Sequence, residues 1–173
     1  MMLAERMLAF AAQAPDIQNR KALGQSLMTL IETVGATRYA CLYLRREGGA
    51  LTIDKSISNL PRLWQELYLE RGYDATDPVF QGVVRGGTYG YWNELTGAMV
   101  LNKQGREVMG AAREFDMRDG FTKRITLDNG GTAVMMVAGL ELVRHARARA
   151  ALRMAFDVFA NDKLNDEHCL TVH

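Results

Sequence analysis

The segment LPRLWQELYLERGYDATDPVFQGVVRGGTYGYW spans residues 60–92 and gathers two tryptophans and several tyrosines into a mostly apolar run. Its first large side chains recur at the spacing i, i+3, i+4, i+7 and i+8, which predicts a helix with one face turned toward the protein interior. Gly72 is expected to end this helix. The side chains on the predicted inner face are Leu60, Leu63, Trp64, Leu67 and Tyr68.

A second helix is predicted to begin at Asp77-Pro78, because aspartate is a common N-cap and proline is tolerated in a first helical turn. Two interpretations of the segment stay open at this point. The aromatic residues can form an ordinary core with Asp77 as a cap. Alternatively, an indole N–H, a phenol O–H and one carboxylate converge in a pocket on a small, mostly apolar ligand.

A family resemblance favours the pocket. The pattern Trp64, Tyr68, Asp77-Pro78, Trp92 and Gly120 resembles the signature of the autoinducer-binding domain of LuxR-type quorum-sensing regulators. The resemblance extends over residues 17–165. It implies an α/β (α+β) fold, an α-β-α sandwich with a central antiparallel sheet that is GAF/PAS-like, and a buried N-acyl-homoserine lactone as ligand.

The resemblance also implies roles for single residues. Trp64 donates to the lactone carbonyl, an ionised Asp77 accepts from the ligand amide, and Tyr68 closes the pocket beside the acyl carbonyl. An indole only donates and a carboxylate only accepts, so this pair fixes the orientation of the ligand. The other residues expected to bind the ligand are Trp92, Val79, Leu60, Met135, Met136 and Tyr43.

Two departures from the family pattern concern the acyl chain. Leu60 stands where many relatives have a ligand-binding tyrosine, and residues 134–137 read Val-Met-Met-Val where relatives often place a serine or threonine. Both changes remove hydroxyl groups and predict a chain without a 3-oxo group, branched or aryl, beside adaptable methionines. Tyr39 or Tyr43 from neighbouring strands remains an alternative source of a hydroxyl.

The rest of the chain reads as helices around two β-hairpins. Strands are predicted at 39–46 and 51–57 and at 121–127 and 132–138, each pair joined by a glycine turn. Helices are predicted before, between and after these hairpins, so helices should cover both faces of an antiparallel sheet. The last helix is predicted over 141–162, with five side chains directed inward: Val143, Ala146, Ala150, Met154 and Val158.

Composition bounds the possible functions. With 173 residues and 48% hydrophobic content, the chain suits a single domain with a sizeable core. A net charge of +1 argues against nucleic acid or an anionic membrane as the main partner. Two cysteines, Cys41 and Cys169, are too few for a disulfide scaffold and fit a reducing cytoplasm.

No residues suggest catalysis or a cofactor. The three histidines lack metal-ligand spacing, no serine lies in a nucleophile elbow, and Asp77 has no partner carboxylate in its segment. The protein is therefore predicted not to be an enzyme and to need neither metal nor cofactor. A GAF-like or PAS-like sensor of another small molecule remains the main alternative. The basic run at 144–149 is expected to be a solvated helix face.

The domain prediction is an autoinducer-binding domain over 1–165, followed at 166–173 by a linker and the first residues of a helix-turn-helix domain that lies outside this chain. The resemblance implies a homodimer that contacts DNA only through that domain. The alanine-rich side of the last helix, Ala146, Ala148, Ala150 and Ala151, would allow a partner to approach closely, and packing of these alanines on the sheet is the alternative. Two alternatives stay open for the ending at His173, a sensor domain cut at its linker or a natural short form that inhibits full-length regulators.

Overall fold

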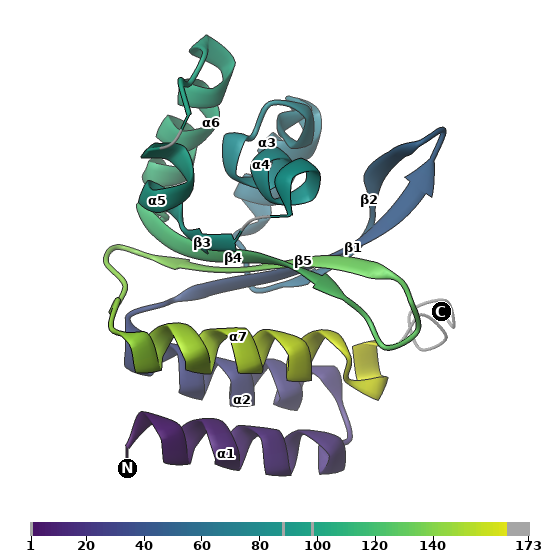
Figure 1. The fold of residues 1–173 in the computed structure, drawn as a ribbon, viewed down its shortest axis with the longest axis vertical. Coiled ribbons are helices and arrows are strands. Elements are labelled where there is room, and N and C mark those ends of the chain that lie inside the picture. Colours follow the sequence, from purple (N-terminus) through teal and green to yellow (C-terminus); the bar gives the residue numbers. More distant parts are fainter. Residues whose placement is uncertain (1, 88, 98, 166–173) are drawn as a thin grey trace.

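A five-stranded antiparallel sheet divides the protein into two helical layers (Figure 1). The computed structural model describes residues 2–87, 89–97 and 99–165. The strand order is β2-β1-β5-β4-β3, so β2 and β3 form the two edges. The strands are β1 Arg38–Glu47, β2 Ala50–Ser58, β3 Tyr89–Tyr91, β4 Asp119–Thr126 and β5 Thr132–Gly139.

One face of the sheet is covered by helices from the two ends of the chain. In Figure 1, α2 and α7 pack directly beneath the sheet and α1 lies below them. The buried side chains of this layer form one continuous apolar cluster with the sheet, and Phe156 and Phe159 of α7 are fully enclosed in it. The elements on this side are α1 Leu3–Gln13, η1 Ala14–Asp16, α2 Arg20–Ile31, η2 Glu32–Val34, α7 Ala146–Ala160 and η4 Lys163–Asn165.

The opposite face carries the helices from the middle of the chain. They stand above the sheet in Figure 1 and pack around smaller apolar clusters centred on Trp64 and Phe80. The aromatic segment therefore folds as a unit on one side of the sheet. Its elements are α3 Arg62–Glu70, η3 Tyr73–Ala75, α4 Pro78–Gly86, α5 Trp92–Gly97 and, further along the chain, α6 Lys103–Glu114.

The predicted α-β-α sandwich with a central antiparallel sheet is confirmed. Both hairpins form at the predicted places, and their inner strands β1 and β5 pair with each other in the middle of the sheet. The short edge strand β3 was not predicted, because its sequence Tyr89-Gly90-Tyr91 is too brief to show a two-residue period. Among the described residues, no helix has the length and apolar character needed to cross a membrane.

The predicted inner face of the first aromatic helix is partly wrong. The helix begins only at Arg62, so Leu60 precedes it and lies in the connection from β2. Leu63 is 70% exposed, whereas Trp64 is buried. The predicted face was one residue too wide, because the buried side is centred on Trp64, Leu67 and Tyr68, and Leu63 lies at the edge of this side, where it is exposed to solvent.

The predicted facing of the last helix is also wrong. Val143, Ala146, Ala150 and Met154 are exposed, and Val158 is only partly buried. The interior is filled by bulkier side chains on the adjoining stripe, which bury more apolar surface than the alanines do. The buried stripe of α7 consists of Ala148, Ala151, Leu152, Ala155, Phe156, Phe159 and Ala160.

Candidate ligand-binding cavity

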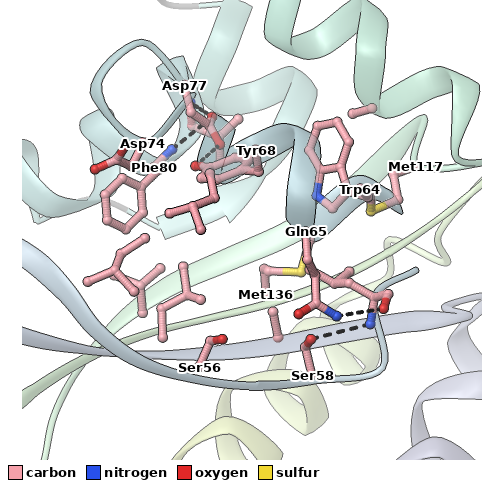
Figure 2. Close-up of a pocket in the computed structure, with 18 of the residues that line it drawn as sticks. Ser56, Ser58, Trp64, Gln65, Tyr68, Asp74, Asp77, Phe80, Met117 and Met136 are labelled. Carbon is pink, nitrogen blue, oxygen red and sulfur yellow. Dashed lines mark hydrogen bonds between the residues drawn. The ribbon is translucent and has the colours of Figure 1, made fainter. Parts of the chain in front are cut away.

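A cavity of about 630 Å³ lies between the sheet and the helices α3, α4 and α6 (Figure 2). Its volume falls within the range of about 300–1,000 Å³ that is typical of small-molecule sites. The floor comes from alternate residues of β1 and β5, from the run Ile53–Ser56 and Ser58 of β2, and from Thr122 of β4, and the roof comes mainly from the aromatic segment. Most of the side chains around it are apolar, with a few polar groups placed among them.

Asp77 sits at the roof of the cavity because it caps α4. Its Oδ1 atom accepts from the backbone N–H groups of Val79 at 3.0 Å and Phe80 at 3.2 Å, as expected of an N-cap followed by proline. Its Oδ2 atom accepts from the Tyr68 hydroxyl at 2.9 Å, which joins α3 to α4. Both predictions for Asp77 meet here, since the capping residue also lines the cavity.

The protein saturates Asp77 only in part. A carboxylate offers about four acceptor positions, and the three protein donors leave one on Oδ2. Burial raises the pKa of the Asp77 carboxyl above its ordinary value, while the hydrogen bonds from Phe80, Tyr68 and Val79 lower it. Burial and the neighbouring Asp77 charge raise the pKa of Tyr68 well above 10, so its phenol keeps its proton and acts as a donor.

Two tryptophans border the cavity and differ in their hydrogen bonds. The Trp92 indole N–H donates to the Thr122 hydroxyl at 2.9 Å. The Trp64 indole N–H has no hydrogen-bond acceptor among the described residues, and Figure 2 shows its nitrogen turned toward the cavity. Trp64 is held in place by ring contacts with Tyr68 at 5.6 Å and Phe115 at 5.4 Å. The Trp64 N–H is therefore a donor of fixed orientation that can bond to a ligand in the cavity.

Gly120 explains how Trp92 reaches its position. A Cβ atom at this glycine would lie 2.6 Å from Cζ2 of the Trp92 ring, closer than any side chain tolerates. The indole therefore lies directly against the backbone of β4. Gly120 belongs to the sequence signature, and its role is to make room for one wall of the cavity.

The sheet places Met135 and Met136 on opposite sides. Met136 borders the cavity together with Val134, whereas Met135 is fully buried in the cluster that α1, α2 and α7 form with the sheet. Tyr43 also belongs to that other side, where its hydroxyl donates to the Ala160 carbonyl at 2.9 Å. The prediction that Met135 and Tyr43 line the cavity is wrong, because neighbouring residues of a strand point to opposite faces.

Seven of the nine predicted ligand-binding residues surround the cavity, and sequence reasoning missed several others. The hydroxyls of Ser56 and Ser58 on β2 and of Thr122 on β4 line it, so the loss of hydroxyls expected from Leu60 and Val134–Val137 is partly made up from other strands. Period-two alternation would have shown that these residues share a face with predicted ones. The seven are Leu60, Trp64, Tyr68, Asp77, Val79, Trp92 and Met136, and the other missed residues include Gln65, Phe80, Val108, Met109 and Met117.

The described residues contain no group of histidine, cysteine, aspartate and glutamate side chains that could hold a metal ion. Cys41 is a free, buried thiol in the sheet, and burial raises its pKa to about 12. Its environment is that of a packed, unreactive side chain. The polar groups of the cavity are instead arranged as separate hydrogen-bond donors and acceptors around an apolar interior, which is typical of a binding site for a small organic molecule.

The fold and cavity define a layered α/β domain that binds a small molecule, and comparison with known proteins identifies the family. Residues 19–162 match the model of the autoinducer binding domain. The chain therefore belongs to the autoinducer-binding domains of LuxR-type quorum-sensing regulators, a family of ligand-sensing domains. No curated protein matches it in sequence.

Solved structures share this fold at low sequence identity. The LuxR-family transcription factor CepR2 from Burkholderia cenocepacia, described as N-acylhomoserine lactone dependent, is 18% identical, with a TM-score of 0.68 over 92% of each chain. SdiA, an Escherichia coli protein, in complex with octanoyl-rac-glycerol is 13% identical, with a TM-score of 0.74 over 96% of this chain and 70% of its own. The phycocyanobilin-bound GAF domain of a cyanobacterial phytochrome is 10% identical, with a TM-score of 0.54 over 100% and 99%.

Proposed function

We propose that the protein senses an N-acyl-homoserine lactone, which it holds in the cavity without catalysing a reaction. One observation carries the proposal, namely that the free indole N–H of Trp64 and the remaining acceptor position of Asp77 face the same cavity. An acyl-homoserine lactone offers a carbonyl for the first and an amide N–H for the second. Each protein group can act in only one sense, so the pair selects both the ligand and its orientation.

Other residues complete the proposed site. Tyr68 holds Asp77 and closes the cavity beside the amide, while Trp92 and Val79 shape the wall around the head group. Leu60 and Met136 border the apolar part of the cavity, where the acyl chain would lie. Removing either polar partner would strand a buried group on the other molecule, at a cost of about 1–3 kcal/mol.

The substitution Asp77→Asn tests the proposal. The amide keeps the shape of the side chain but removes the charge, so we expect the Kd for N-octanoyl-homoserine lactone to rise by roughly ten- to a hundredfold. Asp74→Asn is the matched control, because Asp74 also lines the cavity but accepts no hydrogen bond from Tyr68 or from the α4 backbone amides. Its Kd should remain close to that of the wild type in the same isothermal titration.

Octanoyl-rac-glycerol, the ligand named for SdiA, distinguishes the alternative that the cavity senses a different small molecule. It carries an acyl chain but no amide N–H. Under the lactone proposal it binds more weakly than the lactone, because its glycerol hydroxyls do not present a donor in the place of the lactone's amide N–H. If the glycerol ester binds more tightly, or if Asp77→Asn leaves lactone binding unchanged, Asp77 serves only as a helix cap and the alternative is favoured.

We further propose that the domain forms a homodimer through the exposed side of α7 and regulates DNA binding by a separate helix-turn-helix domain. The support is an exposed apolar stripe of α7 that includes Ala150 and Met154. Ala148 and Ala151 are buried in the core and cannot contact a partner. A two-fold operator requires a two-fold protein. Sedimentation with bound lactone should show a dimer that Met154→Arg dissociates, and a wild-type monomer at micromolar concentration would contradict the proposal.

The boundary expected at residue 165 and the segment 166–173 lie at or beyond the end of the described residues.

A further inference from the structure

The cavity has an opening between α3 and the edge strand β2. Leu69 on α3 lines the cavity and yet is 84% exposed, which places it at a boundary with solvent. Across from it, Ser56 on β2 also lines the cavity and is exposed. Because β2 is an edge strand, no further strand covers this side. The opening therefore has one rim on a helix and the other on a strand.

One end of this opening is closed by hydrogen bonds around Leu60. The Gln65 side chain donates to the Leu60 carbonyl at 2.8 Å, and the Leu60 N–H donates to the Ser58 hydroxyl at 3.3 Å, as Figure 2 shows. These bonds tie the start of α3 to the end of β2. Among the described residues, no hydrogen bond joins the two rims near Leu69 and Ser56, so this end remains open.

The rims of the opening are polar, in contrast to the cavity floor. Arg62 and Glu66 on α3 form an exposed ion pair at 2.9 Å, and Asp54 lies on the β2 side. The strands also contribute apolar side chains to the lining, and α4 adds one more: Leu42, Ile53, Val134 and Met136 on the strands, and Phe80 on α4. A ligand that crosses the cavity thus passes from the polar groups at the roof, through an apolar stretch, to a polar and hydrated rim.

We infer that the acyl chain of the ligand leaves the cavity between Leu69 and Ser56, so that its far end lies in water. This inference rests on the proposed function and names a narrower ligand class: lactones with a chain long enough to reach the opening, including chains with a polar group at the far end. An enclosed pocket would reject such a group, because a buried hydroxyl without a partner is costly. At the open rim the group keeps its hydrogen bonds to water. Leu69 covers the apolar chain as it emerges.

Three lactones test the inference on the wild-type protein. N-tridecanoyl-homoserine lactone and N-(ω-hydroxydodecanoyl)-homoserine lactone have chains of equal length that differ in a terminal methyl or hydroxyl. We expect their Kd values to agree within about threefold, since the terminal group is hydrated in both states. A closed site would weaken the hydroxylated ligand by more than about fivefold. N-butanoyl-homoserine lactone, too short to reach the opening, serves as the reference.

The substitution Ser56→Phe tests the route of the chain. A phenyl ring at the rim should raise the Kd for the tridecanoyl lactone by about tenfold or more and leave the butanoyl lactone nearly unchanged. Thr52→Phe, on the same strand but outside the cavity lining, should affect neither. Equal effects of Ser56→Phe on both lactones, no effect on either, or strong discrimination against the terminal hydroxyl overturn the inference while the proposed function stands. Binding of no lactone at all overturns both.

Discussion

The two faces of the sheet differ in how completely they are filled. Beneath the sheet, Phe156 packs against Phe121 at 5.7 Å, Phe121 packs against Tyr91 at 5.0 Å, and the buried residues form one continuous cluster. Above it, two smaller clusters surround about 630 Å³ of open space. The same five strands serve both sides, and Met135 and Met136 show that one residue along a strand separates a solid core from a cavity wall.

This difference assigns separate tasks to the two layers. The filled face holds the backbone of the sheet rigid, because close-packed interiors resist small displacements. The hollow face can then leave groups such as the Trp64 N–H without a protein partner, since the sheet does not depend on them for its shape. Local unfolding should therefore cost more free energy in the filled layer than in the hollow one.

The largest expected effect is the loss of stability when a side chain of the filled face is removed. Phe156→Ala removes a fully buried ring from the core and should lower the free energy of unfolding by about 3–5 kcal/mol. Met136→Ala should lower it by less than about 2 kcal/mol, because Met136 already borders open space. Urea unfolding of both variants without ligand provides the measurement. Equal losses would show that the two layers contribute equally and that the cavity is not hollow in solution.

The next effect is the gain in stability when a ligand occupies the cavity on the hollow face. A lactone that binds only the folded protein should raise the free energy of unfolding by about 2.7 kcal/mol at a hundredfold excess over its Kd. The rise should appear as a higher midpoint in thermal or urea unfolding. Trp64→Ala should abolish most of it at the same ligand concentration. An unchanged midpoint across a panel of lactones would argue against a ligand in this cavity.

A smaller effect separates the two tryptophans. Trp64→Phe removes a donor that has no protein partner and should weaken lactone binding by about 1 kcal/mol, and it should cost the ligand-free protein only the packing lost with the smaller ring. Trp92→Phe instead leaves the buried Thr122 hydroxyl without its donor and should lower ligand-free stability by about 1–3 kcal/mol. Titration and unfolding of the same two variants give both numbers. The comparison fails if the two substitutions have the same profile.

The smallest effect is a dependence on pH. The folded protein raises the pKa of Asp77, so as the pH falls it takes up a proton above the ordinary aspartate range near 3.8. Protonation relieves the cost of a buried charge in the ligand-free protein, but it also replaces the charged acceptor for the proposed ligand amide with a neutral and weaker one. Lactone binding should therefore weaken as the pH falls through the raised pKa. Asp77→Asn, although a weaker binder, should lose this part of the pH profile in the same titrations.

Local patterns in the sequence predicted much of the fold. The turns at Gly48-Gly49 and Gly130-Gly131 marked both hairpins, and Asp77-Pro78 marked a helix start. The orientation of α7 was not predictable from periodicity, because its alanines and its larger residues form two overlapping stripes. Which of the two faces the sheet depends on the volume that the sheet leaves to be filled.

The candidate site was predicted mainly through its signature residues. Trp64, Tyr68, Asp77 and Trp92 all border the cavity. The sheet residues of the site were harder to predict. A strand with apolar residues on both sides, as in Val134–Val137, does not show which side faces a cavity. The serines of β2 were missed although their alternation with Leu60 places them on the same side, because the sequence does not show that α3 stands over that side.

The close contact between Trp92 and the backbone at Gly120 has a consequence for how such a sensor can change its ligand. This wall is built from an indole against bare peptide, so no exchange of side chain at Gly120 can reshape it without displacing the ring. Leu60 and Met136 meet no such constraint and can exchange for larger, smaller or polar residues. The wall formed by Trp92 is therefore fixed, whereas the parts of the cavity bordered by Leu60 and Met136 can vary, and new ligand preferences should arise through substitutions of the second kind.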